Sequence, residues 1–402
     1  MTQLETKQQI RSLTATFVFV YLVSYLTRIN YGAIISEMEQ ATGFSRSLLS
    51  MAPTGSFITY GVGQIVSGIC GDRFSTKRLI SLGLGITTVM NLLLPLCNNP
   101  YQMLAVWCVN GFAQAMLWPP IVKTMAVYLR QQDYGNAMVK VSWGSSLGTM
   151  AVYLLAPLLI GLMGWKSVFV AAAVCGAVTL IIWHKVGRDV PPTPRKTRVE
   201  SKGTARVIFT PVMLCVLVAI AFHGMLRDSV MTWMPSYVAQ TYQLDNSAAI
   251  LSGVILPLFS LVCFRITERL QRNVFHNLLV CAAVLFGASM LAAGGLYLFP
   301  GAGAVVAVLL LAVIKGAMSG INFLLISLLP RKFHKYGNIS TMSGVLNSAT
   351  YVGSAVSTYG IAVISEQFGW SASTLVWLVL SAASIALCLA NVPGWKKAYP
   401  DE

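Results

Sequence analysis

The sequence is short of charge. Only 10% of its 402 residues are Asp, Glu, Lys or Arg, whereas 56% are hydrophobic. This composition excludes an ordinary soluble domain and is typical of a protein solvated mainly by lipid. Acids are scarcest, with 13 Asp and Glu against 28 Lys and Arg, and the formal net charge is +15. We expect no nucleic-acid partner, because the excess cations follow a membrane topology.

Catalytic and metal-binding patterns are also missing. The sequence has no HExxH metal motif, no GxSxG nucleophile motif and no pair of carboxylates inside its apolar stretches. These absences argue against an enzyme. The eight cysteines lack metal-type spacing and lie in or beside apolar stretches, so we expect buried thiols, with no disulfide, metal or cofactor. The first apolar stretch is too long for a signal-peptide core, and we expect it to be retained.

Apolar runs are what the sequence has in abundance. A helix needs roughly 20 apolar residues to cross a bilayer. We predict an all-α membrane protein with twelve spanning helices. The predicted ranges are 12–35, 48–71, 78–97, 102–129, 135–162, 167–187, 208–238, 246–266, 274–298, 302–329, 337–364 and 370–391.

Most Lys and Arg residues outside these runs lie in loops on one side of the membrane. One set of alternate loops holds most of the Lys and Arg residues, and the other set holds only Arg46 and Lys166. Because basic loops remain in the cytoplasm, both termini are predicted to be cytoplasmic. The short loops suggest a multi-pass protein of the bacterial inner (plasma) membrane. We expect it to function as a monomer in the lipid bilayer.

The two halves of the chain repeat each other. Tyr134-Gly135-Asn136 recurs as Tyr336-Gly337-Asn338, and Arg28 recurs as Arg227 at an offset of 199 residues. We predict two parallel six-helix repeats, the major facilitator fold, with the substrate site between the halves. The boundaries are 1–187 for the N-terminal bundle, 188–207 for a basic cytoplasmic linker and 208–402 for the C-terminal bundle.

Several charges lie where lipid should exclude them. Five cations fall inside predicted spans, whereas Asp228 is the one acid placed well inside a span. Ionisable groups at membrane depth are costly, so they face a cavity, pair with a partner or serve function. An anionic substrate is the simplest neutraliser of this excess. The five cations are Arg28, Lys123, Lys140, Arg227 and Lys315.

Arg28 and Arg227 are the foremost candidates for binding that anion. Each lies deep in its span, they occupy repeat-related positions, and Arg forms forked contacts with phosphate. The three lysines could have structural roles instead of binding substrate. Lys140 lies near a helix end and could extend to the membrane surface, and Lys123 or Lys315 could bridge two helices.

Five further charged residues and one histidine have predicted roles. Asp228 could orient or partly neutralise Arg227, although neighbours on a helix point about 100° apart. His223 lies one turn before Arg227 and could contact substrate, carry a proton or pack in the core. Two pairs at cytoplasmic helix ends are predicted to act as gates. These are Asp72-Arg73 and Glu268-Arg269.

The motifs around these residues resemble the organophosphate:phosphate antiporter family of the major facilitator superfamily, and the resemblance covers nearly the whole chain. The matching segments are residues 25–31 (YLTRINY), 111–120 (GFAQAMLWPP) followed by Lys123, 226–227 (LR) and 233–237 (WMPSY). The resemblance implies that Arg28 and Arg227 are the two phosphate-binding arginines. Tyr31, Gln64 and Trp118 are expected to add substrate contacts.

The chain departs from this family at two places. Where glycerol-phosphate and hexose-phosphate carriers typically have a second-helix lysine, it has the segment 60–64 (YGVGQ). The fifth-helix histidine of the glycerol-phosphate carriers is replaced near Ser145. Lys315, Lys140 and Asn347 are candidates to supply the missing contacts. The particular organophosphate is therefore left open.

The resemblance implies exchange of an organophosphate for inorganic phosphate by alternating access. At ~6 Å and an effective dielectric of about 20, two arginines would repel by roughly 3 kcal/mol, and a dianion would reverse this. The empty carrier should therefore reorient poorly. One alternative is proton-coupled organic-anion symport, with Asp228 or His223 carrying the proton. Another is a non-transporting organophosphate sensor, although no signalling domain is recognisable.

Overall fold

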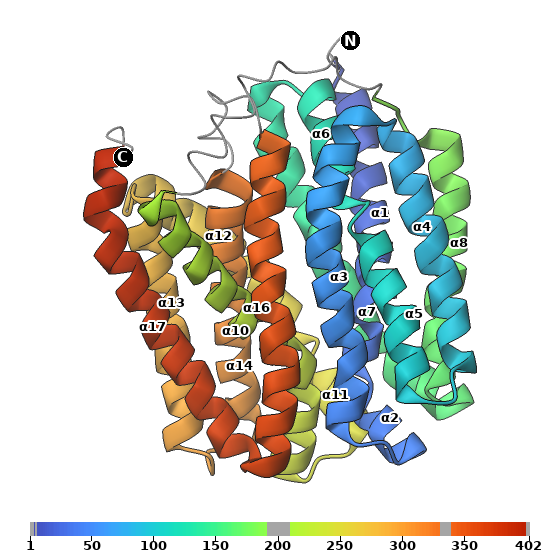
Figure 1. Cartoon of the computed structure of the whole chain (residues 1–402), viewed down its shortest axis with the longest axis vertical. Coiled ribbons are helices and arrows are strands. Elements are labelled where there is room, and N and C mark those ends of the chain that lie inside the picture. Colours follow the sequence, from blue (N-terminus) through green and yellow to red (C-terminus); the bar gives the residue numbers. More distant parts are fainter. Residues whose placement is uncertain (1–3, 5, 191–209, 330–338, 399–402) are drawn as a thin grey trace. The chain divides into compact units, whose positions relative to one another are not determined.

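The computed structural model describes residues 4, 6–190, 210–329 and 339–398, and within these ranges every regular element is helical. The chain divides into two compact units, Met1–Pro194 and Arg195–Glu402 (Figure 1). The division falls inside the predicted basic linker, 188–207, most of which lies outside the described residues.

The first unit begins with a long helix and ends just beyond α8. Its elements are α1 (Lys7–Ala33), α2 (Ile35–Thr42), α3 (Arg46–Arg73), α4 (Thr76–Leu93), η1 (Leu94–Leu96), α5 (Pro100–Gln114), α6 (Trp118–Tyr128), α7 (Gln131–Met163) and α8 (Lys166–Val186).

The second unit repeats this plan. Its elements are α10 (Pro211–Tyr242), α11 (Asn246–Ser252), α12 (Ile255–Asn273), α13 (Leu278–Leu298), α14 (Ala304–Asn322), the π-helical η2 (Phe323–Leu328), α16 (Ile339–Gln367) and α17 (Gly369–Ala398).

Each of the twelve predicted ranges is mainly helical where the structure describes it, although several runs are interrupted and some, such as 274–298, begin before their helix does. Among the described residues, nine segments are long and apolar enough to cross a membrane. The run 102–129 was predicted as one helix, but it breaks between Gln114 and Trp118. Pro119 and Pro120 follow the break, in the first turn of α6, where the amide hydrogen that proline lacks is not needed.

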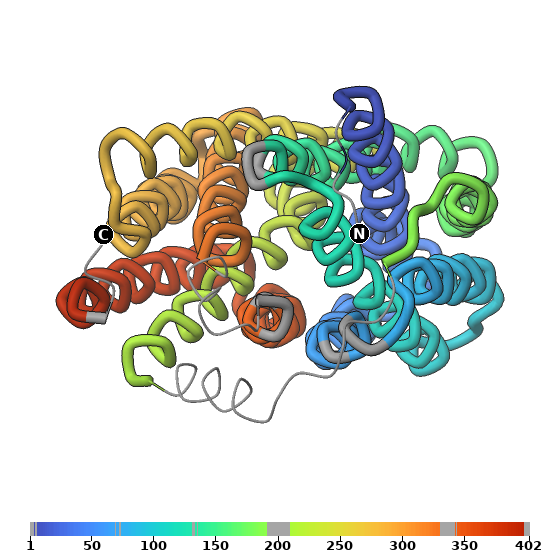
Figure 2. Tube along the Cα trace, turned by 90° about the horizontal axis from the view of Figure 1, so that it is seen from above, coloured from blue at the N-terminus to red at the C-terminus, as the bar shows by residue number. Residues whose placement is uncertain are grey.

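Helix pairing is the same in the two units. In the first unit α1 packs on α7, α3 on α5 and α4 on α8 (Figure 1 and Figure 2). In the second unit the corresponding pairs are α10 with α16, α12 with α14 and α13 with α17. In both, the first helix of the bundle therefore packs on the fifth, the second on the fourth and the third on the sixth. The repeat seen in the sequence thus corresponds to the same helix pairing in both units.

Glycines allow the first and fifth helices to approach closely. A Cβ at Gly144 of α7 would lie 2.5 Å from the carbonyl oxygen of Val18 on α1. In the second unit, a Cβ at Gly353 of α16 would overlap the carbonyl oxygen of Ala221 on α10. These helices carry Arg28 and Arg227, so backbone contact holds each arginine-bearing helix against its neighbour.

Large apolar side chains cover the outside of both units. Leu158 and Leu162 on α7 are 64% and 82% exposed, and Leu291 and Val305 in the second unit are both 74% exposed. Such exposure would be unfavourable in water but suits contact with lipid chains. Polar residues are instead collected inside each bundle.

Candidate functional site

Arg28 on α1 lies between two aromatic rings. Its guanidinium carbon is 4.3 Å from the ring centroid of Tyr25 and 4.9 Å from that of Tyr60. Tyr25 is one turn earlier on α1, and Tyr60 comes from α3, where it is 3% exposed. Aromatic faces stabilise a cation without cancelling its charge. The two tyrosine rings therefore help to orient the arginine.

A buried network of neutral polar side chains backs this part of α1. Gln114 Nε2 on α5 donates to Thr27 Oγ1 at 2.8 Å and to Thr87 Oγ1 at 2.9 Å, and Gln114 Oε1 accepts from Ser24 Oγ at 2.6 Å. Asn91 Nδ2 on α4 donates to the carbonyl oxygen of Thr27 at 3.0 Å. Three helices are thus tied to the residue that precedes Arg28.

Arg227 on α10 is held in a different way. Its Nε and Nη2 donate to Oδ1 and Oδ2 of Asp228 at 2.8 and 2.6 Å. Nη1 donates to Oδ1 of Asn322 on α14 at 3.1 Å, and the guanidinium carbon lies 5.3 Å from the ring centroid of Tyr351 on α16. Arg227 is 8% exposed. The arginine is therefore fixed by a forked ion pair and by groups from two neighbouring helices.

Asp228 extends this arrangement to α16. Ser354 Oγ donates to Asp228 Oδ2 at 2.6 Å, and Asp228 is 7% exposed. Although adjacent residues leave a helix in different directions, these two side chains curl together so that their charged ends meet. The possibility that Asp228 orients and neutralises Arg227 thus has a geometric basis.

His223 lies one turn before Arg227 on α10, and Lys315 lies on α14, which packs on α10. His223 is fully buried, and its Nε2 is 2.9 Å from the carbonyl oxygen of Met318. A carbonyl oxygen only accepts, so Nε2 carries the hydrogen of this bond. Lys315 on α14 is 9% exposed, one turn before Ser319, whose Oγ donates to the Lys315 carbonyl oxygen at 3.0 Å.

Three of the predicted contact residues sit in packed surroundings. Tyr31 is buried, with its hydroxyl 3.6 Å from Met103 Sδ and its ring 5.4 Å from that of Trp107. Gln64 is buried and donates to the Ala115 carbonyl oxygen at 3.5 Å. The Trp118 ring stacks on Tyr21, with centroids 4.7 Å apart. Their predicted contacts with substrate stay predictions.

The remaining predicted contacts are dispersed. Lys123 Nζ donates to the Gly71 carbonyl oxygen at 2.6 Å, as expected of a lysine that bridges two helices. Ser145 Oγ donates to the Ser142 carbonyl oxygen at 2.6 Å. Lys140 is exposed, in keeping with the surface alternative, and Asn347 on α16 is buried.

The predicted gating pairs are only half described. Glu268 and Arg269 are exposed near the end of α12. The side chains of Asp72 and Arg73, at the end of α3, lie outside the described residues. Their gating role stays a prediction.

Sequence reasoning missed four residues that surround the arginines. These are Tyr60, Asn322, Tyr351 and Ser354. Each is a polar or aromatic residue within an apolar span, which is the signal that could have drawn attention to them. Which of them reach an arginine depends on helix pairing. Among the described residues, no group of three His, Cys, Asp or Glu side chains could hold a metal ion.

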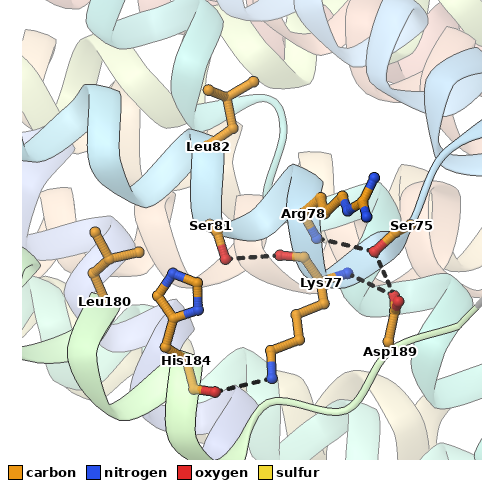
Figure 3. A pocket seen from close by; sticks show the side chains of 8 residues that line it. All are labelled: Ser75, Lys77, Arg78, Ser81, Leu82, Leu180, His184 and Asp189. Atoms are coloured by element: carbon orange, nitrogen blue, oxygen red, sulfur yellow. Dashed lines mark hydrogen bonds between the residues drawn. The ribbon is translucent and has the colours of Figure 1, made fainter.

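A separate pocket of about 440 Å³ lies at the start of α4 and the end of α8 (Figure 3). Asp189 Oδ1 accepts from Ser75 Oγ at 2.7 Å and from the Lys77 amide at 3.1 Å, while Lys77 Nζ donates to the His184 carbonyl oxygen at 2.9 Å. Partial burial opposes ionisation, but the hydrogen bonds from Ser75 and Lys77 prevail and lower the pKa of the Asp189 carboxyl group. The contacts fasten the chain after α8 to the start of α4.

Comparison with known proteins places the chain in a family. The model of the Major Facilitator Superfamily matches residues 17–358. A probable hexose phosphate transport protein of Chlamydia pneumoniae is 22% identical over 93% of this chain and 89% of its own length. A probable chloroplastic anion transporter 4 of Oryza sativa subsp. japonica is 23% identical over 61% of this chain, and the match spans only 44% of that relative.

A solved structure agrees in fold. The crystal structure of a bacterial homologue of the human lysosomal transporter Spinster, in an inward-facing and occupied conformation, has a TM-score of 0.77. It is 15% identical, and the match covers 96% of this chain and 97% of that one. The helix pairing that recurs in the two units and the long match to the family model indicate the same family. The chain belongs to the Major Facilitator Superfamily.

Proposed function

We propose that this transporter exchanges an organophosphate, such as a sugar phosphate, for inorganic phosphate by alternating access. Arg28 and Arg227 bind the phosphate group. One observation carries the proposal: Arg28 and Arg227, 199 residues apart in the repeated halves, each lie deep in the apolar first helix of their unit. A cation at membrane depth requires a counter-charge, and phosphate offers Arg a forked partner.

The surroundings of the arginines support a phosphate ligand. Arg28 is oriented by the rings of Tyr25 and Tyr60, and Arg227 by Asn322 and Asp228. Guanidinium groups held in one orientation lose little side-chain entropy when an anion binds. The relative named as a hexose phosphate transport protein, which matches over most of both chains, favours a phosphate ester as substrate.

We place the protein in the inner membrane of a bacterial cell, as a multi-pass monomer with cytoplasmic termini. The support is the concentration of Lys and Arg in one set of loops.

Proteoliposomes provide the test. Vesicles preloaded with inorganic phosphate should take up a radiolabelled sugar phosphate much faster than vesicles without internal anion. Arg28→Lys and Arg227→Lys keep the charge but lose the fork, and both should reduce uptake. Arg46→Lys is the matched control, because Arg46 instead pairs with Glu39 at the start of α3. Equal uptake with and without internal phosphate would rule out exchange.

Proton-coupled organic-anion symport is a second candidate. It is favoured by the buried carboxylate of Asp228 beside Arg227 and by the relative named as a probable anion transporter. An imposed pH gradient, inside alkaline, should then drive uptake into vesicles that contain no phosphate. Uptake that is independent of the pH gradient but requires internal phosphate would leave exchange as the mechanism.

A further inference from the structure

In the second repeat an acidic residue directly follows the arginine, and in the first repeat none does. Arg227 is followed by Asp228, whereas the neighbours of Arg28 are Thr27 and Ile29. The Asp228 carboxylate meets the Arg227 guanidinium edge to edge, with contacts of 2.8 and 2.6 Å. This is the geometry with which a phosphate or carboxylate ligand would meet an arginine. Asp228 thus occupies the Nε–Nη2 edge of Arg227, where an external anion could otherwise bind.

The carboxylate is itself anchored. Ser354 on α16 donates to Oδ2 at 2.6 Å, and Asn322 on α14 accepts from the remaining guanidinium nitrogen, Nη1, at 3.1 Å. Arg227 and Asp228 are 8% and 7% exposed, so little water screens their attraction. A buried arginine without a counter-ion would be strongly unfavourable, and Asp228 removes that penalty when no substrate is bound.

We propose that Asp228 is a resident counter-anion that competes with substrate for the Arg227 guanidinium. An anion that meets Arg227 on this edge must take over N–H groups that the carboxylate already uses. A monocarboxylate offers Arg227 no more than Asp228 does, whereas a phosphate dianion carries more charge and more acceptor oxygens. The site therefore selects phosphate dianions over monocarboxylates.

The same competition sets how tightly phosphate is held. Because Asp228 replaces the departing anion, Arg227 is not left uncompensated, and substrate can dissociate. This inference rests on the proposed function, since it takes phosphate as the ligand of Arg227.

Asp228→Asn tests the proposal, with inorganic phosphate as the probe and thermal unfolding of the purified protein as the measurement. The amide keeps the shape and an acceptor for Ser354 but removes the charge. Without phosphate the variant should melt at a lower temperature than the unaltered protein. Half-maximal stabilisation should require about ten-fold less phosphate, a difference of about 1.4 kcal/mol. Acetate should stabilise the variant but leave the unaltered protein unchanged.

Two controls isolate the effect. Asp245→Asn makes the same change at the cap of α11, where Asp245 Oδ2 accepts from the Ser247 amide at 3.0 Å, and it should leave the phosphate response unchanged. The double variant Arg227→Gln with Asp228→Asn removes both charges, and should lose the enhanced phosphate response.

Several outcomes would overturn the counter-anion role. If Asp228→Asn folds but binds phosphate more weakly than the unaltered protein, Asp228 is only a positioning residue for Arg227. An unchanged phosphate midpoint, or a variant that stays unfolded in saturating phosphate, also rejects it. Failure of the proposed function is distinguishable: the unaltered protein would then show no organophosphate exchange in proteoliposomes, although Asp228→Asn still gained phosphate affinity.

Discussion

Gln114 on α5 and Thr27 on α1 are joined by a buried hydrogen bond of 2.8 Å, from Nε2 to Oγ1. Thr27 immediately precedes Arg28, so this bond fixes the part of α1 that carries the arginine. The counterpart in the second unit is Leu226, and there the arginine is held by the carboxylate of Asp228. The Thr27–Gln114 bond therefore steadies the helix beside Arg28, whereas Arg227 is itself held by an ion pair.

Replacing Gln114 should destabilise the first unit. Gln114→Met keeps the length of the side chain but leaves the hydroxyls of Ser24, Thr27 and Thr87 without this partner. Each buried polar group that loses its partner costs about 1–3 kcal/mol, so the melting temperature in detergent should fall clearly. Gln102→Met, at an exposed helix start, should have little effect. Equal effects of the two variants would contradict a structural role for the network.

The Tyr60 ring should matter more than its hydroxyl for anion binding. Tyr60→Leu removes the aromatic face beside Arg28, whereas Tyr60→Phe keeps it. Cation–π contacts contribute about 0.5–2 kcal/mol, so the leucine variant should bind phosphate roughly two- to thirty-fold more weakly. Phosphate titration followed by thermal shift measures this. A phenylalanine variant as weak as the leucine variant would show that the hydroxyl, not the ring, is required.

Removing the fork of Arg227 should impair transport. Arg227→Lys keeps a positive charge but cannot offer a phosphate group two parallel N–H donors. A charged hydrogen bond contributes about 1.5–3 kcal/mol, which predicts a loss in apparent affinity of about ten-fold or more. Initial rates of labelled sugar-phosphate uptake measure the effect. Uptake at the unaltered rate would remove Arg227 from the site.

The contact between α10 and α16 should not tolerate a methyl group at Gly353. Its Cβ would overlap the Ala221 carbonyl oxygen, so Gly353→Ala must push the helices apart. Overpacking of this kind costs about 1–3 kcal/mol, and both unfolding temperature and transport should fall. Gly360→Ala on the same helix is the control, because no atom lies within 4 Å of the added Cβ. That variant should be as stable as the unaltered protein or more so.

Asp189 should add a pH-dependent contribution to stability. Its pKa is lowered in the folded protein by hydrogen bonds from Ser75 and Lys77. A lowered carboxyl pKa stabilises the fold above the unfolded pKa, which is about 3.9, and this stabilisation is lost as pH falls through the folded value. The difference in melting temperature between the unaltered protein and Asp189→Asn should therefore be largest near neutral pH and shrink below about pH 4. A difference independent of pH would contradict this.

The helices and the repeat were largely predictable from the sequence because lipid imposes a strict rule on it. A spanning segment must be apolar over roughly 20 residues, and it must satisfy its own backbone hydrogen bonds. Interruptions were harder to place. The break before Trp118 has a clear sequence signal in Pro119 and Pro120, whereas the π-helical turn after Asn322 has none that we recognise.

Side-chain partners were much less predictable. Tyr31 belongs to the same motif as Arg28, yet it lies in a packed cluster with Trp107. Ser354 and Asn322 are distant in sequence from Arg227, and they reach it only because α16 and α14 pack against α10. Such partners depend on helix rotation and side-chain torsions.

By itself the sequence determined that this chain spans a membrane, that it is built from two repeats, and that each repeat places one arginine in its first helix. These properties follow from composition and spacing, which the energetics of lipid solvation translate directly into structure. Only the tertiary structure showed that the rings of Tyr25 and Tyr60 contact Arg28 and that Asp228 forms an ion pair with Arg227. That difference depends on where charged ends meet after the helices have packed, and a linear pattern does not contain those distances.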